Sequence, residues 1–182
     1  MSRAGSILIA PPKKLDEPWT KSVIFLHEDH AGGSVGIILN KRTNINVKDL
    51  TKPMGLYWPT DDIIYRGGPV ADHALCLLHT PEVQFENTMR VNKRFCVSSS
   101  QDMLYQMADM NRPRYWRMFI GLAGWAPGQL DSEIEGTGPW NGAQSWLVAK
   151  AADPALVFHF DGHPQWHKAI EACTQQAIEN WL

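Results

Sequence analysis

Short apolar runs separated by turn-forming residues dominate the beginning of this chain. Segments 6–10, 22–27 and 35–39 are apolar along nearly their whole length, which predicts strands that are buried on both faces. Gly32-Gly33 lies between the second and third runs, as expected for a hairpin. This pattern predicts a sheet that is covered by helices or curled on itself.

The same alternation of apolar runs and turns continues along the chain. Gly67-Gly68-Pro69 forms a turn directly after one apolar run, and Pro113 ends a helical segment before the next run. We predict further strands at residues 63–65, 74–79, 94–97, 115–123, 145–149 and 156–160.

Helical periodicity predicts a short helix at residues 46–50 and two longer ones. Ser98 and Gln101 have the spacing of a capping box, so one helix is expected to open at Ser98 or Ser99. Another begins at Pro164 and continues to the last residues. The C-terminal helix is therefore expected to dock on the body through one apolar side that contains Trp166, Ile170, Cys173, Ala177, Ile178 and Trp181.

Residues 121–134 are the most constrained segment of the chain. An apolar strand leads through three glycines into a helix, for which Pro127 suits the first position and Gly136 the end. Trp125 lies within this turn. Two interpretations stay open, because such a turn either shapes a pocket wall or seals a core.

Composition describes an ordinary globular chain. The 182 residues are 44% apolar and 20% charged, with a formal charge of −2, so one domain is expected and bulk attraction to nucleic acid is not. The three cysteines are scattered and form no CxxC motif, which favours buried thiols in a reducing cytoplasm. No apolar run is long enough for a signal peptide or a membrane span.

Four stretches carry a likeness to a known family. They are residues 5–10 with Pro12, residues 22–24 followed by 36–41, Gly67-Gly68-Pro69-Val70 with Leu78-His79, and residues 124–130. In this order and spacing the chain resembles the YqgE/AlgH family of small bacterial proteins. It departs from the family pattern at Pro11-Pro12 and at Lys41-Arg42, and it is rich in tryptophan.

The resemblance implies a fold and little about function. It implies an α+β single domain with a curved, barrel-like mixed sheet flanked by helices. A founding member of the family was named a transcriptional regulator, although the family has no established DNA-binding motif or catalytic site. A regulatory role is thus implied by the resemblance alone.

Two groups of histidines and carboxylates have residue types that could bind a metal. His27-Glu28-Asp29-His30 lacks the spacing of a zinc-binding HExxH helix, and His159, His163 and His167 surround the start of the last helix. We expect both groups to be ordinary polar ends of elements. No metal and no cofactor is predicted, since the Walker and dinucleotide patterns are also missing.

Nucleic-acid binding is an alternative function. Arg112, Arg114 and Arg117 alternate with Tyr115 and Trp116, a composition that contacts phosphate and stacks on bases. Arg90, Lys93 and Arg94 could extend this patch. The competing explanation is a loop that enters a strand and directs its arginines to solvent.

Protein binding is the function that we favour. Interfaces are enriched in tryptophan, and Trp19, Trp58, Trp140 and Trp146 are candidate anchors if they are exposed. We therefore expect a non-enzymatic cytoplasmic protein that binds another macromolecule, a protein before a nucleic acid, with no membrane attachment. The sequence does not determine its oligomeric state.

A functional surface is expected where the glycine turns meet. Glycines let a ligand approach the backbone, and nearby side chains supply hydrogen bonds. A second alternative, an enzyme with an unrecognised site, would use the same turns; the competing structural interpretation is a packed corner. The candidate residues are Asn40, Arg66, Gly67, Gly68, Pro69, His79, Trp125, Gly128 and Gln129.

Overall fold

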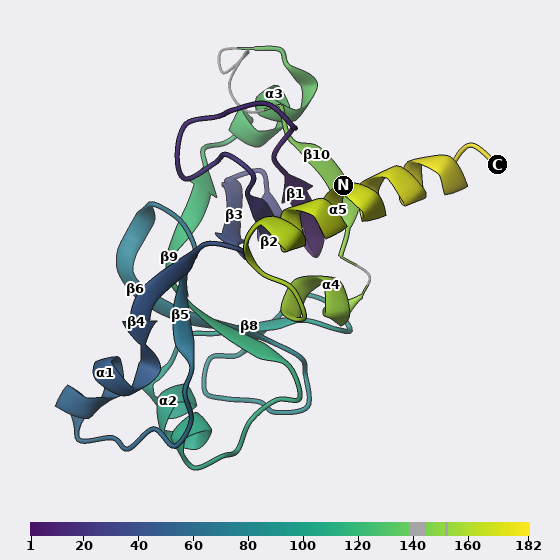
Figure 1. Ribbon diagram of the computed structural model, residues 1–182. Helices are drawn as coiled ribbons and strands as arrows, with labels where there is room; N and C mark the ends of the chain where they lie inside the picture. Colours follow the sequence, from purple (N-terminus) through teal and green to yellow (C-terminus); the bar gives the residue numbers. More distant parts are fainter. Residues whose placement is uncertain (139–144, 152) are drawn as a thin grey trace.

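A long central strand, β9 (Trp116–Trp125), joins the two halves of a strongly curved sheet in the computed structural model (Figure 1). The structure describes residues 1–138, 145–151 and 153–182. Within them the strand order is β10-β1-β2-β3-β9-β6-β8-β7, with β5 pairing to β9 and β4 to β5. All pairs are antiparallel except β5 with β9, so the mixed α+β fold implied by the resemblance is confirmed.

The remaining strands and the helices have the following bounds along the chain. The other strands are β1 (Ser6–Ile9), β2 (Val23–His30), β3 (Gly33–Ile38), β4 (Arg42–Asn46), β5 (Ile63–Arg66), β6 (Val70–His79), β7 (Met89–Arg90), β8 (Cys96–Ser98) and β10 (Leu147–Lys150). The helices are α1 (Val47–Thr51), η1 (Lys52–Met54), α2 (Gln101–Ala108), α3 (Gln129–Glu135), α4 (Pro154–Phe158) and α5 (Gly162–Glu179).

In the half of the sheet built from β10, β1, β2 and β3, the strands inside the edge strand β10 are buried on both faces. Residues 7–10 and 23–26 are completely inaccessible to solvent, as their continuous apolar runs predict. One face packs against α4 and α5, with Trp166 donating its indole N–H to the carbonyl of Ala10 at 2.9 Å. The other face packs against α3, where Leu130 and Trp146 belong to the same apolar cluster.

The other half of the sheet, built from β4 to β8, packs against α1 and α2. Met103, Leu104 and Met107 of α2 form the apolar stripe expected from the sequence, and they are buried with Trp58. The helix opens one or two residues later than predicted, because Ser100, not Ser98 or Ser99, accepts the N–H of Met103. Ser98 instead lies at the end of β8.

Two predictions about the last third of the chain are wrong in detail. Residues 156–160 are not extended, since α4 begins at Pro154 with Asp153 as its N-cap, a start signal that outweighs the apolar run. Pro127 is not the first residue of α3, because Gly128 is its N-cap with a φ of 77°. Gly136 ends α3 as predicted.

Helix α5 docks on the sheet as far as Gln176, which hydrogen-bonds to the backbone of Lys150 on β10, and its end then leaves the sheet (Figure 1). Trp166 and Ala169 are buried, as the predicted stripe requires. Ile178 and Trp181, at the end of that stripe, are 50% and 91% exposed, so the apolar side does not hold the helix down to its last turn.

The cysteine prediction holds for two of the three thiols. Cys76 and Cys96 are buried and unpaired, whereas Cys173 on α5 is half-buried. Burial raises the pKa of the Cys76 thiol to about 12, which keeps it protonated. None of the helices in the described part of the chain has the length and apolar character that a membrane crossing needs.

Candidate functional site

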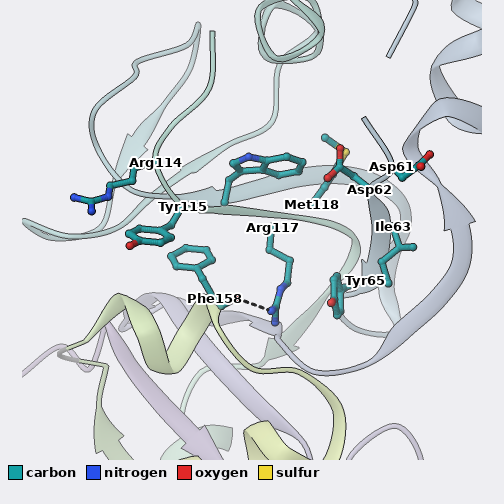
Figure 2. Close-up of a pocket in the computed structure, with 10 residues that line it drawn as sticks. Asp61, Asp62, Ile63, Tyr65, Arg114, Tyr115, Arg117, Met118 and Phe158 are labelled. Atoms are coloured by element: carbon teal, nitrogen blue, oxygen red, sulfur yellow. Dashed lines mark hydrogen bonds between the residues drawn. The ribbon is translucent and has the colours of Figure 1, made fainter. Parts of the chain in front are cut away.

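A polar cleft opens where β5 and β9 diverge. The two parallel strands pair at only two positions, Tyr65 with Phe119 and Arg66 with Ile120. Towards the start of both strands they part, and the space between them is a cleft of about 400 Å³ (Figure 2). The residues that line it are Asp61, Asp62, Ile63, Tyr65, Arg114, Tyr115, Trp116, Arg117, Met118 and Phe158.

Arg117 forms the floor of the cleft and is 7% exposed. Its Nη1 donates to the carbonyl of Leu39 at 2.9 Å and to Oε1 of Gln165 at 3.1 Å. Its Nη2 donates to the carbonyls of Phe158 and Phe160 at 3.2 and 2.8 Å. Burial lowers the pKa of this guanidinium, yet an arginine stays charged, so the four acceptors hold a buried cation.

Tyr65 packs against Arg117 on the other side of the guanidinium, and Asp161 in turn binds Tyr65. The guanidinium carbon of Arg117 lies 4.3 Å from the centre of the Tyr65 ring, and Figure 2 shows the two side chains side by side. The Tyr65 hydroxyl donates to Asp161 at 2.6 Å, and Arg42 forms an ion pair with the same carboxylate. Partial burial opposes ionisation of Asp161, but the hydrogen bonds from Tyr65 and Arg42 hold its pKa below its ordinary value.

Aromatic side chains make the walls of the cleft. The rings of Tyr115 and Phe158 are stacked at a centroid distance of 6.2 Å with an angle of 14° (Figure 2). Trp116 packs edge to face against Trp58 at 6.2 Å. Arg112 lies against both indoles, with its guanidinium carbon 4.9 Å from the Trp58 ring centre and 5.4 Å from that of Trp116.

The two ends of the cleft carry opposite charge. Figure 2 shows Arg114 at one end and Asp61 with Asp62 at the other. Asp62 accepts the indole N–H of Trp58 at 2.8 Å, while Asp61 is mostly exposed and pairs with Lys48 at 2.5 Å. Within the described residues no carboxylate lies within 4 Å of the Arg114 guanidinium.

The glycine turns meet elsewhere, at the opposite end of β9. A Cβ at Gly68 would lie 2.1 Å from the carbonyl oxygen of Leu122, and one at Gly121 would lie 2.3 Å from the carbonyl of Gly68. The Gly67 N–H donates to the carbonyl of Ile120 at 2.9 Å. The turn that runs from Arg66 through Pro69 therefore packs backbone against backbone, and these atoms leave no space for a ligand between the two glycine segments.

Most of the other candidate residues near this corner are used internally. Asn40 accepts the N–H of Val23 at 3.0 Å and donates to the carbonyls of Lys21 and Gly162. Gln129, which follows Gly128, accepts the N–H of Ala126 and donates to Glu133, both at 3.0 Å. These hydrogen bonds connect distant segments of the chain and account for the polar atoms of both amides.

Trp125 is packed in a cluster of three indoles. It is 6% exposed, and its ring lies 6.4 Å from those of both Trp19 and Trp146. The indole N–H groups of Trp125 and Trp146 both donate to Glu133, at 3.0 and 2.8 Å. The structural interpretation of this turn is thus the better one.

His79 does not lie beside the glycine turns, contrary to the expectation from the sequence. It pairs with Trp116 at the cleft end of β9, seven residues from Ala123 and therefore about 23 Å along the strand. The imidazole is fully buried and connects the carbonyl of Thr80, at 2.8 Å, with the hydroxyl of Ser98, at 2.7 Å. This serine-histidine pair was not predicted, and with Ser98 only 1% exposed it has no contact with solvent.

The arginines of the predicted nucleic-acid patch point in different directions. Arg112 donates to the carbonyl of Met107 and to Thr60, both at 2.8 Å, and its side chain is 11% exposed. Arg117 is buried, and Trp116 is half-buried beside Arg112. Arg114 is the member of this set that is exposed.

The expected tryptophan anchors are turned inward. Trp58 and Trp146 are 1% and 3% exposed, and Trp19 packs on the indole cluster. Trp140 lies outside the described residues. The most exposed indole of the described chain is that of Trp181, which the sequence placed in the buried stripe.

The histidine groups do not assemble a metal site in the part of the chain that the structure describes. His163 and His167 flank Trp166, at ring distances of 5.7 and 5.1 Å. His159 packs edge to face against Tyr115 at 5.2 Å.

The sequence singled out the segment from Arg114 to Arg117 only as a nucleic-acid patch, and it missed the remaining residues of the cleft because each looks ordinary. Tyr65 and Phe158 lie in apolar runs, and Asp61-Asp62 precede a strand as any polar turn could. A signal for the cleft is present in the sequence as a pair of features. Two adjacent carboxylates directly precede one buried strand, and an aromatic-rich basic segment directly precedes another.

Comparisons with known proteins give the chain a family. The AlgH-like family model matches residues 7–177. The chain is 33% identical over 166 residues to a UPF0301 protein of Marinomonas, covering 89% of this chain and 84% of that protein. It is 31% identical over 180 residues to a UPF0301 protein of Methylobacterium, covering 92% and 82%.

Solved structures agree with this assignment. The solution structure of the AlgH protein from Pseudomonas aeruginosa is 27% identical, with a TM-score of 0.76 over 94% of this chain and 89% of that one. A crystal structure of a protein from Corynebacterium diphtheriae is 25% identical, with a TM-score of 0.70 over 93% and 86%. The chain belongs to the AlgH-like family.

Proposed function

We propose that this protein is a non-catalytic binding protein that holds an extended segment of a protein partner in the cleft between β5 and β9. The observation that carries the proposal is the cleft itself, an opening in a sheet with aromatic walls and opposite charges at its ends. Such a surface matches a peptide that is basic at one end, apolar in the middle and acidic at the other.

The backbone of β9 supports an extended ligand. Ile120 accepts the Gly67 N–H, so the alternation of a strand directs the backbone groups of Met118 to the same edge. In the described chain the parallel pairing of Tyr65 with Phe119 uses the carbonyl of Met118, so the backbone groups that β5 leaves unpaired on this edge are the N–H of Met118 and those of Trp116. A peptide strand could hydrogen-bond to this stretch, as in other cases of strand addition.

The side chains of the cleft favour binding over catalysis. Arg117 is saturated by four acceptors, and Asp161 is held as an ion pair. Burial and the hydrogen bond to Asp161 raise the pKa of Tyr65, so its hydroxyl stays protonated near neutrality. The hydrogen bonds of these groups stabilise their present protonation states and do not favour proton transfer. A regulatory role of the protein would depend on the identity of the bound partner.

A titration with synthetic peptides tests this function. The probe is a fluorescein-labelled nonapeptide with two lysines at one end, a valine- and tyrosine-containing middle and two glutamates at the other. Fluorescence anisotropy should show saturable binding, and a peptide of the same composition in scrambled order should bind at least about tenfold more weakly. Equal affinity for both peptides would contradict the proposal.

Charge reversal locates the binding to the cleft. Asp61→Lys combined with Arg114→Glu should reverse the preference, so that the variant favours a peptide with its charged ends exchanged. Glu179→Lys, at an exposed position on α5, is the matched control and should leave the preference unchanged. A reversed preference in the control as well would place the peptide elsewhere.

A further inference from the structure

A second hollow, separate from the cleft, lies at the start of the sheet. It has a volume of about 470 Å³ and is formed by the N-terminal segment, the turn before β8 and the end of β10. These three segments are far apart in the sequence. The lining residues are Ser2, Ala4, Gly5, Ser6, Asn92, Lys93, Arg94, Lys150 and Ala151.

The charged residues of this hollow are all cations. Lys93, Arg94 and Lys150 are exposed, and no aspartate or glutamate in the described part of the chain lines the hollow. Among the described residues no carboxylate lies within 4 Å of these three cationic groups. The nearby Arg3 differs, because Asp29 and Asp131 bind it at 3.1 and 2.7 Å.

The turn at Asn92 leaves one hydrogen-bond donor unused beside this hollow. The Asn92 Oδ1 accepts the N–H groups of Arg94 and Phe95 at 2.8 and 3.1 Å. The guanidinium of Arg90 donates to the carbonyls of Asn92 and Lys93 at 3.1 and 3.4 Å. These bonds satisfy the acceptors of the turn and leave Nδ2 of Asn92 without an acceptor among the described residues.

The lack of a side chain at Gly5 leaves room for the amide of Asn92. A Cβ at residue 5, where φ is 89°, would lie 2.6 Å from Nδ2 of Asn92. The absence of a side chain at Gly5 therefore lets the amide lie against the N-terminal segment. An amide donor and cationic groups thus share one concave surface.

Lys150 is held on the other side of the hollow by a side chain of α5. The N–H of Lys150 donates to Oε1 of Gln176 at 3.0 Å, and Nε2 of Gln176 donates to the carbonyl of Lys150 at 3.1 Å. Lys150 also pairs with Ser6 in the register of β10 and β1. The backbone that carries this cation is consequently fixed relative to the N-terminal segment.

Three cations without a carboxylate partner repel one another, and an anion with several oxygens relieves that repulsion. We propose that this hollow binds a phosphate group of a nucleotide or of a nucleic-acid backbone. Phosphate oxygens accept from ammonium, guanidinium and amide donors alike, which matches Lys93, Arg94, Lys150 and Asn92. The net charge of the chain is −2, so a cation-only hollow is a local property and not a reflection of composition.

The experiment titrates the full chain with three probes, namely inorganic pyrophosphate, ADP and a fluorescent single-stranded RNA of twelve nucleotides, at two salt concentrations. Saturable binding of pyrophosphate or ADP assigns the site to small ligands, and binding of the RNA alone assigns it to a nucleic-acid backbone. Both results support phosphate recognition. No saturable binding of any probe at millimolar concentration overturns it.

Variants place the binding at this hollow. Asn92→Asp keeps the oxygen that caps Arg94 and Phe95 but replaces the amide donor with negative charge, and it should weaken binding at least about tenfold. Lys93→Gln with Arg94→Gln should do the same. The matched control is Lys13→Gln with Lys14→Gln, which removes the same charge from two exposed lysines elsewhere.

The control separates a site from general attraction. Lys13→Gln with Lys14→Gln should change the affinity by less than about twofold. An equal loss in the control and in the hollow variants would overturn the proposal. Circular dichroism and thermal unfolding of each variant test whether the fold is retained. The peptide titration of the cleft does not involve these residues, so its affinity should be unaffected.

Discussion

The two ends of β9 differ in how closely the chain packs against them. At the C-terminal end the glycines at 67, 68 and 121 bring two backbones into contact, with no room for a single methyl group. The N-terminal end carries Tyr115 and Trp116 and no glycine. There the neighbouring strand β5 separates from β9 and leaves a cleft. Glycine here marks close approach of the chain to itself, and bulky aromatic side chains mark the opening.

This difference corrects the functional expectation from the sequence. Glycine turns were expected to admit a ligand to the backbone, and in this fold another stretch of the same backbone occupies that place. The four predictions that follow test the contrast between the closed and the open end, from the largest effect to the smallest.

Gly68→Ala should be the most damaging change. The new Cβ would lie 2.1 Å from the carbonyl oxygen of Leu122, at a φ of 152° that disfavours a side chain. We expect the free energy of unfolding to fall by about 4 kcal/mol or more, measured by urea denaturation. Gly128→Ala is the control: its φ is 77° but nothing lies within 4 Å, so it should cost about 1 kcal/mol.

If both alanine variants lose the same stability, the closed end is not held by close packing. The contrast with the open end would then rest on backbone strain alone.

Arg117→Met should destabilise the open end next. The substitution removes a buried cation and leaves the carbonyls of Leu39, Phe158 and Phe160 without this donor. The expected loss is about 3 kcal/mol in urea denaturation, in the range for breaking one partner of a buried polar network. A loss below about 1 kcal/mol would mean that water replaces the guanidinium and that Arg117 does not buttress the cleft.

Acid should weaken the fold through its buried histidines. Burial lowers the pKa of both His79 and His27, so the folded protein holds these rings neutral while the unfolded chain, with a pKa near 6.5, takes up protons first. Stability is therefore complete above about pH 6.5 and is lost as the pH falls below it, by at most about 1.4 kcal/mol per pH unit for each group.

Thermal unfolding between pH 8 and pH 5 measures this slope. His79→Gln should reduce the slope whatever it does to stability at pH 8. His73→Gln should leave it as it is, because the side chain of His73 is 98% exposed. An unchanged slope in His79→Gln would show that this ring does not contribute.

Arg114→Gln should have the smallest effect on stability. The side chain lies at the rim of the cleft over the Tyr115 ring, at 5.4 Å, and is exposed. The free energy of unfolding should change by less than about 0.5 kcal/mol, while the affinity for the acidic end of the peptide falls. A large loss of stability would make Arg114 a structural residue like Arg117.

Local features of the fold were predictable from the sequence. The first three strands, the stripe of α2 and the end of α3 at Gly136 follow from apolar periodicity and turn residues. The apolar run at residues 156–160 predicts a strand, but five apolar residues do not distinguish a strand from a helix, and Asp153-Pro154 begins the helix α4 at this point.

The cleft could not be predicted in the same way. It depends on where the pairing of β5 with β9 stops, and these strands are about fifty residues apart in the chain. Arg112 and Arg117 looked equivalent in a basic aromatic segment, but Arg112 packs on Trp58 and Arg117 is enclosed by carbonyls of α4 and the segment after it. Side-chain direction in that segment is decided by tertiary packing, which residue type and spacing do not encode.

The position of β9 has a consequence for how this protein is made. Strands β3, β5 and β6 all hydrogen-bond to β9, so none of them completes its pairing until residues 116–125 exist. During synthesis from the N-terminus, more than half of the chain has left the ribosome before the two halves of the sheet acquire their common partner. The apolar strands that precede it must meanwhile avoid aggregation without their common partner, because unpaired strand edges and exposed apolar surface associate readily.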